Sequence, residues 1–335
     1  MSARVSSEAV LAARSAVAAS VSDLGAGDLL IVACSGGPDS LALAGALAAV
    51  AAPASLRTLA VAVDHGLQDG SAGVSVAAAS TCRRLGIDEA VVVAVQVGTE
   101  GGPEAAARTA RYAALESVAV ERDASAVLLG HTRDDQAETV LLRLARGSGA
   151  RSLSAMRTRS GPWRRPFLGL SRAQVHTAAR DLLEPLGVEP WTDPHNADRT
   201  FARVRIRAVL EDLTAAVGPG AVLGLSRSAE LLRDDADALE AWSQREADRV
   251  VVIEGGERSV DCAALTDLPR AIRTRVIRGM CLAAGSPPDQ LTIEHVERVE
   301  AFVTDWRGQG AASLPGGVEA TRAYGRLCLR SSTRP

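Results

Sequence analysis

The first half of the chain alternates short apolar runs with longer stretches of helical composition. The apolar runs, rich in β-branched residues, cover 29–34, 59–65, 90–97 and 126–131, and the helical stretches follow them at 39–52, 72–86, 103–122 and 134–146. Each run is continuously apolar rather than alternating in polarity, which is typical of strands covered on both faces. The order predicts an α/β fold with a doubly wound parallel sheet, whose ligands bind beyond the carboxyl ends of the strands.

The pattern changes after residue 146. Residues 147–212 are rich in loop-forming residues and arginine, with one helix expected near 171–186, and VGPG at 217–220 marks a predicted boundary. The 335 residues suit a division into a larger domain, 1–216, and a smaller one, 217–335. The smaller domain is predicted to be mainly helical α+β, with a long helix at 222–250, strands around 249–262, helices near 269–284 and 292–307, and a terminal hairpin.

Composition removes several classes of protein. No stretch approaches the roughly 20 uninterrupted apolar residues of a membrane helix, and the amino terminus lacks a basic segment followed by a dense apolar core. We therefore expect a soluble cytoplasmic protein with no membrane partner. The five cysteines are widely spaced and form no C-x-x-C pair, which argues against a disulfide framework, a cysteine-ligated zinc and an iron–sulfur cluster.

The net charge of −3 hides an uneven distribution. All 37 basic residues are arginine, and thirteen of them lie with only five acids between Thr139 and Arg207, so that this segment carries +8 and the rest of the chain −11. A basic segment on an otherwise acidic chain indicates a polyanionic partner that meets one face. A solvated basic surface without a partner is the alternative.

SGGPDS, residues 35–40, joins the first predicted strand to the helix after it. Two adjacent glycines let an anion approach the backbone N–H groups of the first helical turn, where the helix dipole favours negative charge. Ser35 and Ser40 add hydroxyl donors, and Pro38 suits a first turn. A chain without lysine cannot form a Walker A loop, so a bound triphosphate has to be neutralised by backbone N–H groups, arginine and a divalent cation.

Asp39, at the mouth of this loop, is the predicted cation ligand, because magnesium bound with phosphates takes one or two carboxylates from the protein. HTRDDQAET, residues 131–139, supplies a second set of acids at the end of the fourth strand. Thr132 and Asp135 have the spacing of a capping box, and Glu138 lies one turn further on the same face. Capping and complementing the helix dipole are the alternative roles of these acids.

Four segments together carry a resemblance to a known family. SGGPDS, GHTRDDQAET (130–139), RRPFLGLSR (164–172) and DPHNADRTFARVRIR (193–207) resemble those of the tRNA(Ile)-lysidine synthetases, which are PP-loop ATP pyrophosphatases. SGGxDS is shared by all PP-loop enzymes, and the second and fourth segments narrow the resemblance to this family. It covers most of residues 29–210 and extends loosely into the carboxyl part, so the larger domain is expected to have the PP-loop fold.

The resemblance implies a ligase that joins free L-lysine to C2 of the wobble cytidine in a CAU-anticodon isoleucine tRNA. Cytidine O2 would attack the α-phosphorus of ATP, giving an adenylated cytidine and pyrophosphate, and the lysine amine would then displace AMP. Ser35, Gly36, Gly37, Pro38, Asp39 and Ser40 would bind ATP. Asp39 and Asp135 would hold Mg²⁺, and Glu138 would receive the lysine ammonium group, which makes these three acids the expected catalytic residues.

The remaining expected site residues are arginines. Arg108 and Arg111 match the family's E-x-x-AR-x-x-RY pattern together with Glu104 and Tyr112, and they stand three apart, where they can contact phosphate or the substrate carboxylate. Ion pairs with Glu104 and Glu116 are the alternative. The segment 139–207 is expected to face tRNA, with Arg164, Arg165, Arg203 and Arg207 among the substrate contacts. His65 and His131, also at strand ends, either line the nucleotide pocket or are structural.

The chain departs from the family pattern at two positions. Val204 stands where asparagine is expected, and His195 stands where serine is common, although Asn196 and its neighbouring motif residues are kept. Other PP-loop enzymes are the alternative assignments. A cluster-dependent tRNA thiolase needs C-x-x-C pairs, an NAD or GMP synthetase leaves the basic segment unexplained, and a nucleotide-binding module without catalysis leaves Asp39, Asp135 and Glu138 unexplained.

Overall fold

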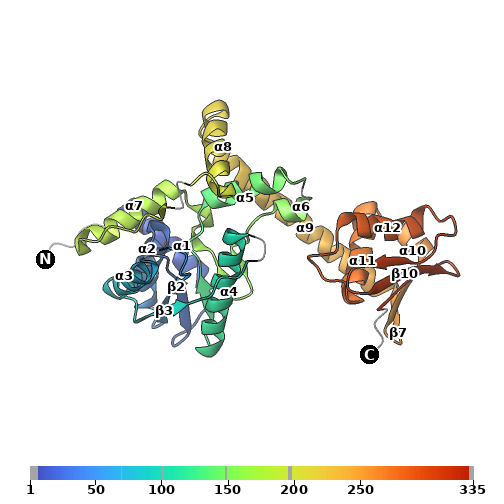
Figure 1. Ribbon diagram of the computed structural model, residues 1–335, viewed down its shortest axis with the longest axis horizontal. Helices are drawn as coiled ribbons and strands as arrows, with labels where there is room; N and C mark the ends of the chain where they lie inside the picture. The colour runs from blue at the N-terminus through green and yellow to red at the C-terminus, as the bar shows by residue number, and fades with distance from the viewer. Residues whose placement is uncertain (1–6, 69, 100–101, 148, 195–197, 332–335) are drawn as a thin grey trace. The chain divides into compact units, whose positions relative to one another are not determined.

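The computed structural model describes residues 7–68, 70–99, 102–147, 149–194 and 198–331 (Figure 1). Contacts divide the chain into two compact units, Met1–Leu231 and Leu232–Pro335. The division falls inside helix α9 (Ala221–Val250), whereas the boundary expected from the sequence lies earlier, where helix α8 (Ala202–Val217) ends.

The first unit alternates strands and helices over its amino-terminal half, as predicted. The other helices of this unit are α1 (Glu8–Ser20), α2 (Pro38–Ala51), α3 (Ser71–Arg84), α4 (Pro103–Glu121), α5 (Arg133–Leu144), α6 (Ala150–Leu153) and α7 (Arg172–Leu183), with 3₁₀ turns η1 (Pro166–Gly169) and η2 (Glu184–Leu186). The strands are β1 (Leu29–Ala33), β2 (Arg57–Asp64), β3 (Glu89–Ala94), β4 (Ala126–Leu128), β5 (Arg159–Ser160) and β6 (Trp163–Arg164).

The sheet of this unit has the order β3-β2-β1-β4-β6-β5. The pairs β1–β2, β2–β3, β1–β4 and β4–β6 are parallel, and only the edge pair β5–β6 is antiparallel. Ile31 at the centre pairs with Leu59 on one side and Val127 on the other. The strand order reverses between β1 and β4, which is the position where open α/β sheets bind their ligands.

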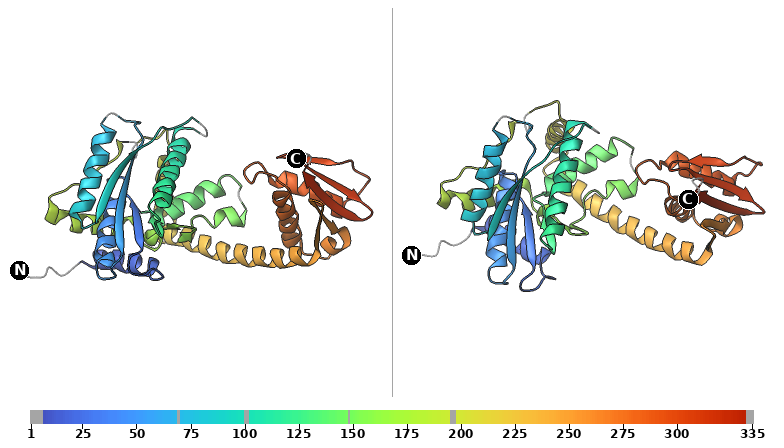
Figure 2. Two further views of the ribbon diagram at one scale, coloured as in Figure 1. Left: turned by 90° about the horizontal axis from the view of Figure 1, so that it is seen from below. Right: turned by 60° about the horizontal axis from the view of Figure 1, so that its bottom comes forward.

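The two faces of the sheet bury different residues. Leu30 and Val32 belong to a core with residues of α1, α2, α3 and α7, whereas Leu29 and Ile31 belong to a second core with residues of α4. Figure 2 shows the strands between α3 and α4. The prediction of a doubly wound parallel sheet is confirmed, and its continuously apolar strands follow from this burial on both faces.

Among the helices longer than five residues, α1 and α8 were not expected from the sequence. The amino-terminal helix α1 begins at Ser7, whose side chain accepts a hydrogen bond from the Val10 N–H. Helix α8 lies in the segment expected to be rich in loops, and Leu210 is its one buried residue. Its first turns read RVRIR, and this alternation of arginine with Val204 and Ile206 does not have the period of a helix.

The second unit combines helices with a small antiparallel sheet of order β7-β8-β11-β10-β9. Its core includes Ile272, Val299 and Leu327, and the prediction of a second, mainly helical α+β domain is confirmed. After α9 its elements are β7 (Val251–Glu254), β8 (Glu257–Asp261), α10 (Cys262–Thr266), α11 (Arg270–Ala283), α12 (Ile293–Thr304), β9 (Ala312–Leu314), β10 (Val318–Ala323) and β11 (Arg326–Ser331).

Among the described residues, no single helix is both long and apolar enough to cross a membrane. Helices α8 and α9 reach the length and mean hydropathy of a membrane span only when they are counted together, and the chain bends by 106° between them.

Candidate active site

A cavity of about 1560 Å³ opens at the carboxyl ends of β1, β2 and β4 in the first unit. It brings together segments that are far apart in the sequence, namely the loop of residues 35–40, the end of β2, α4, and the starts of α5, α7 and α8. Most of the residues expected from the sequence line it, including Ser35, Gly37, Pro38, Asp39, Ser40, Arg108, Arg111, Asp135, Glu138, Arg203 and Arg207.

The loop of residues 35–40, called the PP loop below, is shaped by its glycines and by one hydroxyl group. Gly36 has φ +81°, and a Cβ atom there would lie 3.3 Å from that of Ala78. The Ser40 hydroxyl donates to the Gly37 carbonyl at 2.9 Å and accepts from the Ser35 N–H at 3.2 Å. Gly37 caps α2 without any side-chain hydrogen bond, so the first N–H groups of this helix remain available to an anion.

Gly130 lets the two sides of the cavity approach each other. A Cβ atom at this position would lie 3.1 Å from the Asp39 carbonyl oxygen and 3.4 Å from the Ser40 nitrogen. Glycine at the start of the GHTRDDQAET segment therefore allows the loop after β4 to pack against the start of α2. This contact places Asp39 and the acids of α5 around one cavity.

Asp39 has a carboxylate oxygen without a hydrogen bond. Its Oδ1 atom is buried and has no hydrogen-bond partner among the described residues, although His176 Nε2 lies 3.2 Å away at an angle unsuited to hydrogen bonding. Buried carboxylate oxygens are normally satisfied, so one without a donor suits a bound cation.

Asp135 is held by hydrogen bonds to both of its oxygens. Oδ2 accepts from the Thr132 N–H at 2.7 Å and from the Thr132 hydroxyl at 2.8 Å. The first of these bonds and the Asp135 N–H, which donates to the Thr132 hydroxyl, form the capping box of α5. Oδ1 accepts from Arg172 Nη2 at 3.0 Å. Burial alone would raise the pKa of Asp135, but Arg172 and these hydrogen bonds lower it below its ordinary value. The carboxylate is thus charged but already engaged.

Glu138 is more deeply buried, with 3% of its side chain exposed, and it is paired with two arginines. Its Oε1 atom accepts from Arg172 Nη2 at 2.9 Å and from Arg207 Nε at 3.0 Å. Arg172 thereby bridges Asp135 and Glu138, and its backbone N–H also donates to Asp134 at 2.7 Å. The acids of α5 form an ion-pair network with α7 and α8.

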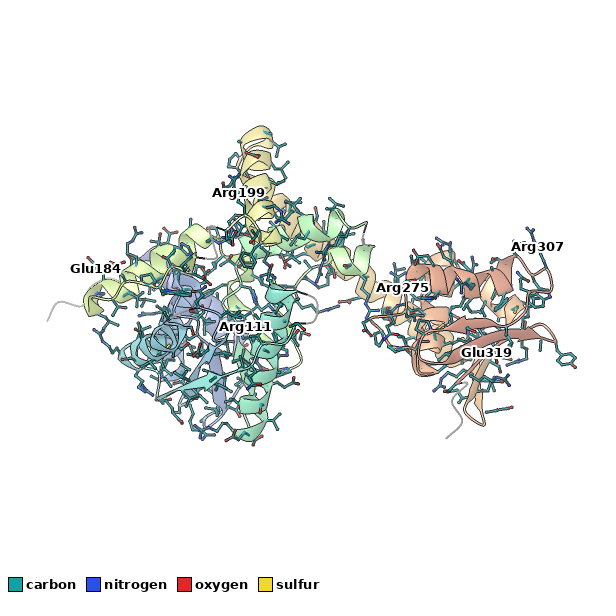
Figure 3. The ribbon with its side chains drawn as sticks, in the orientation of Figure 1. Arg111, Glu184, Arg199, Arg275, Arg307 and Glu319 are labelled. Atoms are coloured by element: carbon teal, nitrogen blue, oxygen red, sulfur yellow. The ribbon has the colours of Figure 1, made fainter. Side chains whose placement is uncertain are left out.

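Arginine side chains of α4 form another wall of the cavity, and both lie next to Tyr112. Arg108 Nη2 donates to the Tyr112 hydroxyl at 3.1 Å, and the guanidinium groups of Arg108 and Arg111 lie 4.9 and 5.7 Å from the centre of the Tyr112 ring. Glu104, the expected ion-pair alternative, pairs instead with Arg203 at 3.1 Å. Burial lowers the pKa of Arg111, which lies on α4 (Figure 3) and has no carboxylate partner among the described residues.

Two histidines at strand ends also line the cavity. Burial, with a smaller effect of Arg111, lowers the pKa of His131 to about 3, and the same two causes lower the pKa of His65. Both imidazoles are therefore neutral near pH 7. The Nδ1 atom of each is buried without a hydrogen-bond partner in the described part of the chain, so both can still bond to a ligand.

Arg164 and Arg165 do not line the cavity. Arg164 is 5% exposed and binds Asp23 through two hydrogen bonds of 2.6 and 3.0 Å. Arg165 is 8% exposed, and its Nη1 atom donates to the Arg157 carbonyl at 3.0 Å. The Arg164 guanidinium holds the pKa of Asp23 well below its ordinary value. Of the arginines expected to contact tRNA, these two lie inside the fold.

Two residues beside the PP loop were not identified from the sequence. Trp191 donates its backbone N–H to the Gly36 carbonyl at 2.9 Å, and His176 stands next to Asp39. His176 follows Arg172 by four residues on α7, a spacing that places both on one helix face and that could have revealed it. Val204 lines the cavity, whereas His195 and Asn196 lie outside the described residues.

Comparisons with known proteins match both units of the chain. A family model of the PP-loop domain matches residues 13–213, and a model of the TilS substrate binding domain matches residues 261–328. A tRNA(Ile)-lysidine synthase of Thermobifida fusca is 55% identical over 94% of this chain and 96% of its own length, and one of Streptomyces coelicolor is 50% identical over 90% and 85%.

The fold is also found in a solved structure of lower sequence similarity. The U34-tRNA thiolase NcsA of Methanococcus maripaludis, determined with its [4Fe-4S] cluster, superposes with a TM-score of 0.55 at 20% identity, covering 68% of this chain and 80% of that one. At this identity the likeness concerns the fold alone.

Proposed function

The chain belongs to the tRNA(Ile)-lysidine synthase family, and we propose that it forms lysidine in the cavity at the carboxyl ends of β1 and β4. It is an enzyme that uses ATP and acts on tRNA. The observation that carries the proposed location is the meeting of the PP loop and the acids of α5 at the point where the strand order reverses.

ATP binds with its pyrophosphate portion on the PP loop. The uncapped amino terminus of α2, the glycines and the Ser35 hydroxyl provide donors for phosphate oxygens, and no lysine is needed. The α-phosphorus then faces the cavity. There, O2 of the wobble cytidine attacks it in line, the bond to the β-phosphate oxygen breaks, and pyrophosphate leaves from the loop that held it.

Mg²⁺ fits beside Asp39, whose buried Oδ1 atom has no hydrogen-bond donor among the described residues. A cation at this position supplies charge neutralisation for the triphosphate and for the departing pyrophosphate. Asp39 is the direct ligand. Asp135 can add a second oxygen through Oδ1, which accepts one hydrogen bond from Arg172 and retains a lone pair.

Lysine binds on the α5 side of the cavity. Glu138 accepts its ammonium group in exchange for Arg207, while Arg172 stays in place because it also binds Asp135. Arg108 and Arg111 offer positive charge to the substrate carboxylate or to a phosphate group. The ε-amine of lysine, after its ammonium group has given a proton to Glu138, then attacks C2 of the adenylated cytidine, and AMP leaves with the electrons of the C2–O2 bond.

Arg203 and Arg207 contact tRNA from α8, where both line the cavity mouth. The ion pair of Arg203 with Glu104 is partly exposed and therefore weak, so it can be replaced by a pair with phosphate. Arg164 and Arg165 are assigned to the fold rather than to the substrate.

The test is incorporation of labelled lysine into an isoleucine tRNA transcript with a CAU anticodon, with AMP and pyrophosphate measured in the same reaction. The matched control is the same transcript with uridine at the wobble position. We expect one AMP and one pyrophosphate for each lysine incorporated and no incorporation into the control. Release of ADP, or equal labelling of both transcripts, would contradict the proposed chemistry.

A further inference from the structure

His176 contacts the PP loop from the neighbouring helix α7. Its Nε2 atom lies 3.2 Å from Asp39 Oδ1, and its side chain is 45% exposed and lines the cavity. On the same face of α7, Arg172 lies one turn before it and Arg180 one turn after it, and both also line the cavity. Helix α7 thus presents one imidazole to the carboxylate to which the cation role has been assigned.

The contact between these two atoms has the spacing of two adjacent metal ligands. Two ligand atoms each about 2.1 Å from a metal lie about 3.0 Å apart at a right angle and about 3.4 Å apart at a tetrahedral angle. The observed 3.2 Å falls between these values. Such ligands aim their lone pairs at a shared point away from the line that joins them.

The relative orientation of His176 and Asp39 also fits two ligands of one metal ion. Asp39 Oδ1 is buried and accepts no hydrogen bond within the described residues, although a ring nitrogen is within reach. A histidine held there only as an ion-pair partner would point its N–H at the oxygen. This pair instead leaves the oxygen without a donor and the nitrogen beside it.

We propose that His176 is a second ligand, through Nε2, of the divalent cation that Asp39 binds with ATP. Nitrogen ligation adds affinity for first-row transition metals and little for Mg²⁺, which prefers oxygen. The site therefore accepts Mn²⁺ or Co²⁺ as well as Mg²⁺, and His176 sets the preference among them. This inference rests on the proposed role of Asp39 in cation binding and goes beyond it.

The experiment uses Mn²⁺ and an ATP analogue with a methylene bridge between the α- and β-phosphorus atoms, which cannot be cleaved. Pulsed electron paramagnetic resonance of the full chain with both compounds detects coupling to a coordinated imidazole nitrogen. We expect this coupling in the wild type and in H131Q and H65Q, and its loss in H176Q. Its absence from the wild type, or its persistence in H176Q, would overturn the inference.

A competition experiment tests the preference itself. With the same analogue bound, H176Q should lower the affinity for Co²⁺ by roughly tenfold and the affinity for Mg²⁺ by less than about twofold, since only Co²⁺ gains much from the imidazole. R180Q, one turn along α7, should change neither. Equal losses for both metals in H176Q would contradict nitrogen ligation.

The two proposals fail in different ways. If Mn²⁺ with the analogue binds D39N as tightly as the wild type, the cation role of Asp39 is wrong and the role of His176 falls with it. If binding depends on Asp39 but shows no nitrogen coupling, only the inference about His176 is wrong.

Discussion

The two sides of the cavity carry similar acids in different states. On the loop side, residues 35–40, the Asp39 carboxylate has a buried oxygen without a hydrogen-bond donor among the described residues. On the helix side, at the start of α5, Asp135 and Glu138 are already bound by Thr132, Arg172 and Arg207. From the sequence, Asp39 and Asp135 were both expected to hold Mg²⁺, and the structure separates them.

We infer that Glu138 on the helix side binds lysine by exchanging one of its hydrogen-bond partners, whereas Asp39 on the loop side binds a cation directly. A group without partners can gain a ligand without losing any contact. A buried carboxylate in a network already shares its oxygens with guanidinium groups, so its replacement affects stability as well as activity. The predictions below test this contrast.

The largest effect is expected at Asp39. D39N removes the negative charge but keeps the shape of the side chain, and overall lysidine formation should fall by at least about 1000-fold, in the range of lost electrostatic stabilisation at an active site. The thermal midpoint should stay within a degree or two, because no described hydrogen bond to Oδ1 is lost. Turnover close to the wild-type rate would remove Asp39 from the mechanism.

Replacement of Glu138 should affect both activity and stability. E138Q leaves Arg172 and Arg207 without a shared negative partner, so we expect lysine incorporation to fall about 100-fold and the free energy of unfolding to fall by about 2 kcal/mol. Activity at saturating lysine and thermal unfolding measure the two effects. A variant with reduced activity and unchanged stability would show that the network is not structural.

His131, in the loop between β4 and α5, should make the free energy of unfolding depend on pH. Its pKa is 6.5 in the unfolded chain and about 3 in the folded one, so as the pH falls below 6.5 the unfolded chain takes up the proton first. The free energy of unfolding should therefore fall by about 1 kcal/mol per pH unit from this residue between pH 6 and pH 4. Chemical denaturation over this range should show a shallower slope in H131Q, and equal slopes would refute the prediction.

The smallest effect is expected in the salt dependence of tRNA binding. It distinguishes the arginines that line the cavity from those inside the fold. R203Q should lower the slope of log K against log salt for tRNA binding by about 1, as expected for one lost phosphate contact. R164Q should leave that slope unchanged and lower the thermal midpoint, because it breaks the pair with Asp23. A lower slope in R164Q together with an unchanged slope in R203Q would show that Arg164 contacts tRNA and Arg203 does not.

Much of the fold could be predicted from the sequence because strands buried on both faces leave long apolar runs. The four parallel strands β1 to β4 and the helices between them follow the pattern closely. Strands β5 and β6, next to each other at one side of the sheet, have only two residues each and leave no such signal. Helix α8 was missed because its start alternates arginine with apolar residues and only Leu210 is buried.

The site could be predicted where its geometry depends on neighbouring residues in the sequence. It could be predicted less well where it depends on hydrogen-bond partners that are distant in the sequence. SGGPDS indicates its own loop geometry, since the glycines and Ser40 shape the turn from within. The partners of Arg164 and Glu138 lie 141 and 69 residues away, at Asp23 and Arg207, and no local pattern reveals them. A count of charges in the segment 139–207 therefore cannot separate structural arginines from those at the cavity.

The two half-reactions distinguish the two sides most directly. Pyrophosphate release from ATP and the CAU-anticodon tRNA should be measured without lysine and then with lysine, in the wild type, D39N and E138Q. We expect that D39N releases no pyrophosphate under either condition, whereas E138Q releases it without lysine near the wild-type rate and then incorporates lysine about 100-fold less. Equal loss of pyrophosphate release in both variants would contradict the division of roles between the loop side and the helix side.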